Sequence, residues 1–209
     1  MTKKVMLLLA DGFEPLEAAG FTDVLGWANI DGSEPIQLIS VGLKAKLTAT
    51  FGFSVIPDLL IDEVDLDDFD AIAIPGGFEG AGFYKEALGD KFGEIIRYFD
   101  AAEKPVASVC VASLAVAASG CLKGRKATVY HQVGGKRKAQ LEESGAIFID
   151  SPVVKDNNII TSTGPGTAIE VAFQLLEDLT CANNVAHIRR LMRMPAPDQT
   201  WFNTPQVAV

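Results

Sequence analysis

The chain has 209 residues, 48% of them hydrophobic and 19 of them glycine, a composition typical of one compact α/β domain. Its formal net charge of −9 argues against nucleic acid and against an anionic membrane surface as partners. The apolar run 6–10 follows two lysines, as in a signal peptide, but no small-residue cleavage site follows it. Three widely spaced cysteines favour a reducing compartment and give no zinc-binding spacing. We therefore expect a cytoplasmic protein without a metal site.

Strands and helices alternate along the predicted chain. Apolar runs predict strands over residues 5–10, 36–41, 71–74, 106–109, 126–131, 146–149 and 159–162. Helices are predicted over 15–29, around 92–99, from 110 to about 120, after residue 131 to about 144, after the turn 163–167 to 179, and over 185–194. Residues 46–57 are typical of a small hairpin or irregular pair, and the aspartate-rich stretch 62–70 of a solvated loop or helix face.

This alternation predicts an α/β fold, with a mostly parallel sheet between two layers of helices. We see no internal repeat and no linker, so residues 1–194 are expected to form one domain. Residues 195–209 contain three prolines and are expected to form an extended tail. Its aromatic residues, Trp201 and Phe202, are expected to dock on the body or on a partner subunit.

Cys110 lies where a β-branched apolar run passes directly into an alanine-rich helix. In an open α/β sheet such a turn lies at the carboxyl edge, where ligands bind, with the first amides of the helix behind the side chain. These N–H groups stabilise a thiolate and lower the pKa of a cysteine. Because free cysteines are also among the most buried residues, a buried and inert Cys110 is the alternative.

Glu17 shares a helical stripe with Phe21, Val24 and Ala28, which predicts that its carboxyl lies on the buried side of the first helix. Burial would raise its pKa, and the protonated carboxyl could then donate a hydrogen bond to a Cys110 thiolate. The two groups would titrate as a coupled pair. A surface carboxylate near the helix N-terminus is the alternative.

Three turns follow predicted strands: the turn before Glu17, the segment Pro75-Gly76-Gly77, and the Cys110 turn. If their strands are neighbours, the turns meet at one edge of the sheet. The backbone N–H groups of Gly77 and Val111 are then candidates for stabilising an oxyanion.

Four segments resemble, in order, motifs of the DJ-1/PfpI (ThiJ) superfamily, which is related to the class I glutamine amidotransferase-like fold. They are residues 8–17 (LLADGFEPLE), 74–77 (IPGG), 109–110 entering a helix, and 161–168 (TSTGPGTA) followed by Glu170. The resemblance covers about residues 5–180. It implies a flavodoxin-like three-layer α-β-α sandwich, usually a homodimer, with a reactive cysteine on a strained turn.

Carried over by position, the resemblance implies that Cys110 is the nucleophile and that Glu17 contacts its sulfur. It assigns the oxyanion site to the backbone of Gly76, Gly77 and Val111. It also implies that Gly164, Pro165 and Gly166 form a further loop of the site.

The chain departs from the family pattern at three positions. Peptidases and hydrolases of the PfpI type carry a histidine directly after the cysteine, where this chain has Val111. Related proteins often place a histidine on a later strand, where this chain has Tyr130, with His131 one residue beyond. Because strand side chains alternate faces, this offset favours a solvated or hydrogen-bonded His131, which we keep as a weaker candidate. Ala112 replaces a common glycine.

The resemblance implies cysteine chemistry on a small carbonyl compound, with no cofactor. The leading hypothesis is conversion of 2-oxoaldehydes such as methylglyoxal to hydroxy acids, as by a glyoxalase III. One alternative is a non-catalytic redox-sensing stress protein whose Cys110 oxidises to a sulfinate stabilised by Glu17. Another is a peptidase or amidase of the PfpI type, which Val111 disfavours.

Overall fold

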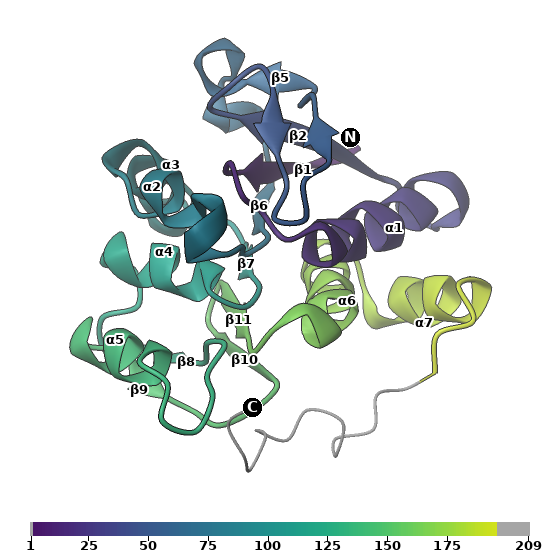
Figure 1. The fold of residues 1–209 in the computed structure, drawn as a ribbon. Helices are drawn as coiled ribbons and strands as arrows, with labels where there is room; N and C mark the ends of the chain where they lie inside the picture. Colours follow the sequence, from purple (N-terminus) through teal and green to yellow (C-terminus); the bar gives the residue numbers. More distant parts are fainter. Residues whose placement is uncertain (1, 196–209) are drawn as a thin grey trace.

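A seven-stranded sheet separates two layers of helices in the computed structural model of the chain, which describes residues 2–195 (Figure 1). The strand order is β10-β11-β7-β6-β1-β2-β5, and all neighbours are parallel except β10 and β11. The predicted α-β-α sandwich with a mostly parallel sheet is therefore confirmed. Trp201 and Phe202 lie outside the described residues, so the prediction for the tail is untested.

The strands of the central sheet are β1 (Lys3–Leu9), β2 (Ile36–Gly42), β5 (Leu59–Leu60), β6 (Ala71–Ile74), β7 (Val106–Ser108), β10 (Val153–Asp156) and β11 (Ile159–Ser162). Two smaller sheets accompany it. The antiparallel pair β3 (Leu47–Thr48) and β4 (Ser54–Val55) is the predicted hairpin. The parallel pair β8 (Lys126–Ala127) and β9 (Ile147–Phe148) lies outside the central sheet.

The predicted strand 126–131 is wrong in length, because β8 ends after Ala127. The next amide, of Thr128, donates to the Thr161 side-chain hydroxyl at 2.9 Å, so it is not available to a strand ladder. Sequence reasoning also missed β5 and β10. The first has only two residues, and the second ends in Lys155 and Asp156, which are typical of a surface loop.

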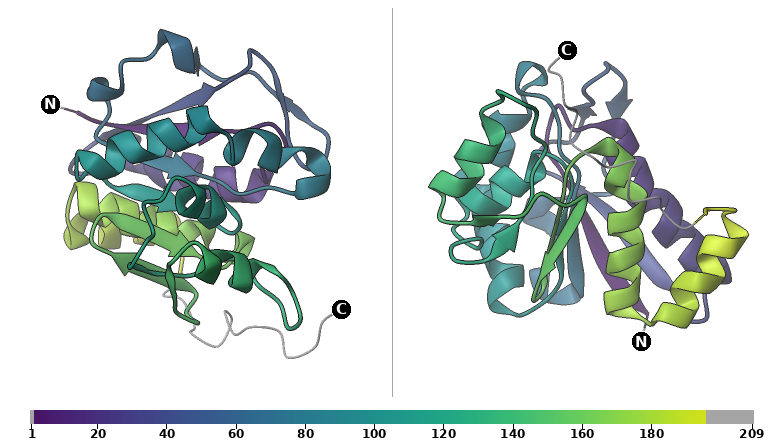
Figure 2. Two further views of the ribbon diagram at one scale, coloured as in Figure 1. Left: turned by 90° about the vertical axis from the view of Figure 1, so that its left-hand side faces the viewer. Right: turned by 90° about the horizontal axis from the view of Figure 1, so that it is seen from below.

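Two groups of helices cover the sheet (Figures 1 and 2). One face carries α1 (Pro15–Asp31), α6 (Ala168–Leu179) and α7 (Ala182–Leu191). The other carries α2 (Phe83–Ala87), α3 (Asp90–Ala101), α4 (Ala112–Ala118) and α5 (Arg137–Glu143). Short 3₁₀ turns are η1 (Ile61–Glu63), η2 (Leu66–Asp68), η3 (Glu79–Ala81) and η4 (Pro165–Thr167). Within residues 2–195, every helix is too short or too polar to cross a membrane.

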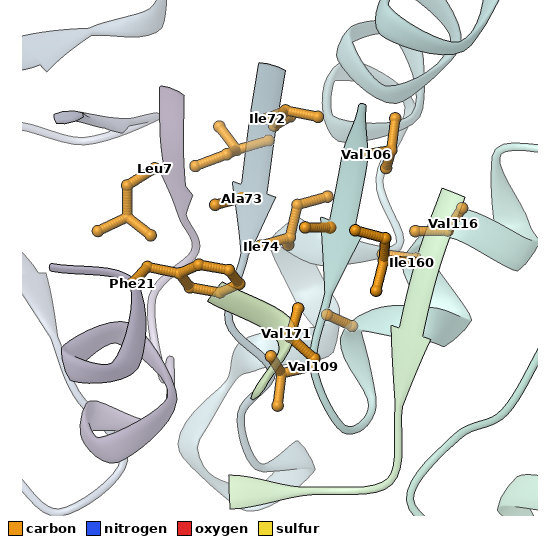
Figure 3. Close-up of a cluster of buried hydrophobic side chains, with 14 of the residues drawn as sticks. Leu7, Phe21, Ile72, Ala73, Ile74, Val106, Val109, Val116, Ile160 and Val171 are labelled. Carbon is orange, nitrogen blue, oxygen red and sulfur yellow. The ribbon is translucent and has the colours of Figure 1, made fainter. Parts of the chain in front are cut away.

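The core lies on both faces of the central strands. Strands β1, β6, β7 and β11 contribute buried apolar side chains, which meet Phe21 and Val171 on one face and Val116 on the other (Figure 3). On the first face α1 and α6 pack closely, since a Cβ at Gly20 would lie 2.8 Å from that of Ala168. This packing fixes α1 against the sheet and so fixes the side chains at its N-terminus.

Strands β1, β6 and β7 are immediate neighbours and parallel. Their carboxyl ends therefore meet at one edge, as the sequence predicts for the three turns that follow them. The strand order reverses at this edge, because β1 has β2 as its neighbour on one side and β6 as its neighbour on the other. Such switch points are the usual ligand sites of open α/β sheets.

Candidate active site

Cys110 occupies a strained turn between β7 and α4. Its φ of 61° lies in the left-handed region, which is uncommon for a residue other than glycine. The Cys110 N–H donates to Ser162 O at 3.0 Å, and the Val109 N–H donates to Ile74 O at 3.1 Å. These bonds to β11 and β6 hold the strained conformation, a kind of strain that clusters at functional sites.

Glu17 reaches the same place from the first turn of α1, and its side chain has no exposed surface. Phe21, Val24 and Ala28 are buried on the same stripe, which confirms the predicted orientation of the helix. The carboxyl oxygen Oε2 accepts a hydrogen bond from the Gly76 N–H at 2.6 Å. Oε1 is also buried and accepts no N–H or O–H of residues 2–195, so the Cys110 thiol is the remaining polar neighbour of the carboxyl.

Gly76 lies between the two side chains and permits their approach. A Cβ at this position would lie 2.9 Å from Glu17 Oε2 and 3.1 Å from the Cys110 Cβ. At Gly77 a Cβ would lie only 2.3 Å from Gly12 O, because this residue is bridged to Phe13 beside β1. The β6 turn must therefore be built of two glycines.

The predicted oxyanion amides divide into two roles. Gly76 N–H is taken by Glu17, and Val111 N–H points at the Cys110 sulfur. Within the described part of the chain, no group accepts a hydrogen bond from the Gly77 N–H. The structure thus brings Cys110, Glu17 and all three predicted amides together.

Glu14 is a site residue that sequence reasoning missed. It caps α1, with its Oε2 accepting from the Glu17 N–H at 2.8 Å, and its own N–H donates to Gly76 O at 2.7 Å. It is buried, and its negative charge raises the pKa of Glu17. The available signal was an acidic residue before Pro15, three positions ahead of Glu17.

The Glu17 carboxyl and the Cys110 thiol form a coupled acid pair. Burial raises the pKa of Glu17 to about 8, and the Gly76 N–H and the Cys110 thiol, which favour the carboxylate, offset only part of this rise. Burial also raises the pKa of Cys110, and the charge of Glu17 raises it further, whereas the Val111 N–H lowers it. The expected lowering by the helix N-terminus is present but is outweighed by burial.

Tyr130, rather than His131, is the residue whose backbone meets Cys110. Its N–H donates to Cys110 O at 3.5 Å, and its ring lies against Gly164. The His131 ring packs edge-on against Phe148, with Nδ1 2.8 Å from Val129 O and Nε2 3.3 Å from an Asp150 carboxylate oxygen. The Tyr130 ring therefore lies beside Gly164, whereas the His131 ring, one residue further on, lies beside Phe148 and Asp150.

The loop of Gly164, Pro165 and Gly166 follows Ser162, the residue that accepts the Cys110 N–H, and leads through η4 into α6. The Thr167 hydroxyl donates to Gly164 O at 2.7 Å and fixes the loop. This loop therefore borders the cysteine turn as the sequence motif implies. Among residues 2–195, no three His, Cys, Asp or Glu side chains are grouped to hold a metal ion.

Known proteins resemble the chain over most of its length. The model of the DJ-1/PfpI family matches residues 3–178. The chain is 29% identical to Protein dj-1beta of Drosophila melanogaster over 192 residues, covering 91% of this chain and 96% of that one. It is 37% identical to Deglycase PfpI of Pyrococcus furiosus over 163 residues, which cover 78% of this chain and 91% of that protein. The crystal structure of Drosophila melanogaster DJ-1beta superposes with a TM-score of 0.81 at 28% identity, and the match covers 94% of this chain and 100% of that one.

The paired pKa shifts predict how Cys110 reacts with iodoacetamide as pH changes. In Glu17→Gln the negative charge beside the thiol is lost, so the labelling curve should move to lower pH. Peptide mapping by mass spectrometry measures this, with the half-buried Cys121 of the same molecules as the internal control. A Cys110 curve that is unchanged, or that moves to higher pH, would contradict the coupling.

Proposed function

Because the chain belongs to the DJ-1/PfpI family, we propose that it is a cysteine-dependent enzyme that converts 2-oxoaldehydes such as methylglyoxal to 2-hydroxy acids. The observation that carries this proposal is the buried Glu17 carboxyl, which shares a site with the strained Cys110. A base beside a nucleophile suits a reaction that forms a carbon–sulfur bond and then moves a proton between carbons.

The first step uses the minor form of the singly ionised pair, in which Glu17 holds the proton and the Cys110 sulfur carries the charge, because the pKa shifts favour the proton on sulfur. The Cys110 sulfur attacks the aldehyde carbon, C1, and the proton held by Glu17 passes to the aldehyde oxygen. The product is a neutral hemithioacetal beside a Glu17 carboxylate. While charge develops on the oxygen, the Gly77 N–H donates to it and stabilises it.

The second step is an isomerisation. The Glu17 carboxylate takes the hydrogen of C1 as a proton, and the electron pair moves onto the C2 oxygen to form an enediolate. Glu17 then returns the proton to C2, and the hydroxyl proton moves from the C1 oxygen to the C2 oxygen. The result is a thioester of the 2-hydroxy acid, which one water molecule hydrolyses to restore Cys110 and its shared proton.

A deglycase reaction is the second candidate, since two relatives at 35% and 37% identity carry that name. It would use the same sulfur on a carbonyl group already joined to an amine or a thiol. Peptide hydrolysis fits less well, because Val111 cannot supply the proton transfers that a histidine supplies there. We further propose that, as the sequence suggests, no cofactor takes part.

We also propose that the protein acts as a homodimer. An aromatic rim of exposed apolar residues borders the site, consisting of Leu16, Phe51, Phe53 and Phe78. Phe51 and Phe78 have ring centres 6.0 Å apart, and Phe13 under the rim meets Phe53 at 6.4 Å. An apolar groove of about 260 Å³ continues it beside α1, lined by Phe13, Pro15, Phe53 and Val55. Contiguous exposed apolar patches of this kind mark protein contacts.

Turnover of methylglyoxal tests the enzyme proposal. Wild-type protein should form lactate, Cys110→Ser should lose at least 100-fold in kcat, and Cys121→Ser, at a cysteine remote from the pair, should retain the wild-type rate. Lactate assayed in the absence of glutathione measures the outcome. Wild-type protein that forms no lactate, yet is oxidised at Cys110 by peroxide, would favour the redox-sensing alternative.

Light scattering after size-exclusion chromatography tests the dimer. Phe51 is 72% exposed in the isolated chain, and Phe51→Asp places a charge in the aromatic rim, which should weaken the dimer at least tenfold. Ile30→Asp is the matched control, because Ile30 is 79% exposed near the opposite end of α1. A monomeric wild type, or equal dissociation by both variants, would refute this interface.

A further inference from the structure

Tyr84, in the first turn of α2, has a buried hydroxyl for which residues 2–195 supply no hydrogen-bond partner. A buried polar atom without a partner is rare in folded proteins and requires an explanation. The residue before it, Phe83, packs against Gly77, so Tyr84 adjoins the turn that supplies the free amide of the site.

Arg137 holds the Tyr84 ring from the N-terminus of α5. Its guanidinium lies 4.9 Å from the ring centre, donates to Glu79 at 3.2 Å and to Gln140 at 3.1 Å, and the Arg137 side chain is only 19% exposed. Glu79 lies in the loop after β6 and is itself 56% exposed. Glu79 is exposed, so its ion pair with Arg137 contributes little stability, and neither residue bonds the Tyr84 hydroxyl.

Tyr84 follows Phe83, which packs on Gly77, and the neighbouring Gly76 lies against the Cys110 Cβ, so α2 begins beside the cysteine turn. Burial, opposed by the Arg137 charge and aided by a Cys110 thiolate, raises the pKa of Tyr84 to about 12. The hydroxyl is therefore protonated at neutral pH and remains a hydrogen-bond donor. The Glu17–Cys110 reaction leaves one position without a protein partner, namely the C2 oxygen, which carries the enediolate charge.

We propose that the Tyr84 hydroxyl binds the C2 oxygen of the substrate and so selects carbonyl compounds with two vicinal oxygens. This inference rests on the proposed function, because it assigns the second oxygen of the same substrate. The Gly77 N–H receives the C1 oxygen, and the Tyr84 hydroxyl donates to the C2 oxygen as charge develops there. No proton leaves the tyrosine, so the atom balance of the reaction is unchanged.

Steady-state kinetics with methylglyoxal give the first test. Tyr84→Phe should lower kcat/KM tenfold or more, while the rate of Cys110 labelling by iodoacetamide stays within twofold of the wild type. Tyr98→Phe is the matched control, because Tyr98 lies on α3 and its hydroxyl bonds Asp67. A wild-type kcat/KM in Tyr84→Phe, or an equal loss of labelling that reveals a merely structural role, would overturn the inference.

A second readout does not need turnover. Hydroxyacetone and acetone differ by one oxygen next to the carbonyl carbon, and each should slow the labelling of Cys110 by occupying the site. In the wild type hydroxyacetone should protect at a concentration at least tenfold lower than acetone, and in Tyr84→Phe the two should protect alike. Equal protection in the wild type would refute the role of Tyr84, whereas absent lactate formation with the expected protection would refute only the proposed function.

Discussion

Burial of the Glu17 carboxyl constrains every loop that meets at Cys110. An ionised carboxylate without solvent is costly by several kcal/mol, so the protein must either keep the group protonated or surround it with donors. It does both, because the Gly76 N–H donates to Oε2 and the pKa of Glu17 is raised to about 8. The position of the β6 turn, and the glycine at position 76, follow from this contact.

The scaffold accounts for the precision of the contact. Adjacent parallel strands β1, β6 and β7 bring three turns to one edge, and the packing of α1 on α6 at Gly20 sets the depth of Glu17. The left-handed conformation of Cys110 costs of the order of 1–3 kcal/mol and persists because bonds to β6 and β11 determine it. The packed core thus keeps the Glu17 carboxyl and the Cys110 thiol buried and close together, whereas without it both groups would turn toward solvent.

Much of this arrangement was predictable from the sequence. The stripe of Glu17, Phe21 and Val24 predicted the orientation of α1, and the apolar runs predicted five of the seven strands of the central sheet and the three turns of the site. Hydrophobic periodicity could not give β5, which has only two residues, or the early end of β8, which depends on a hydroxyl of Thr161 far along the chain. Long-range contacts of this kind leave no local pattern.

The chemistry of the site was predicted less completely. A cysteine at a helix N-terminus suggests a low pKa, but the structure shows that burial and Glu17 oppose this effect, and only a three-dimensional environment reveals which is larger. Tyr84 carries no local signal, because its meaning lies in an unpartnered hydroxyl beside Arg137. Residue type and spacing identify the reacting pair, whereas the surrounding donors emerge from packing.

The central claim is that Glu17 is a buried, protonated acid, and the pH dependence of unfolding measures it most directly. Its pKa rises from 4.5 to about 8 on folding, so the folded protein binds the proton more tightly, and this stability is lost as pH rises between those values. Urea unfolding of wild type and Glu17→Gln should show the wild type losing up to about 1.4 kcal/mol per pH unit relative to the variant between pH 5.5 and 7.5. A difference that stays constant over this range would mean that Glu17 is ionised in the folded protein, and would contradict the account.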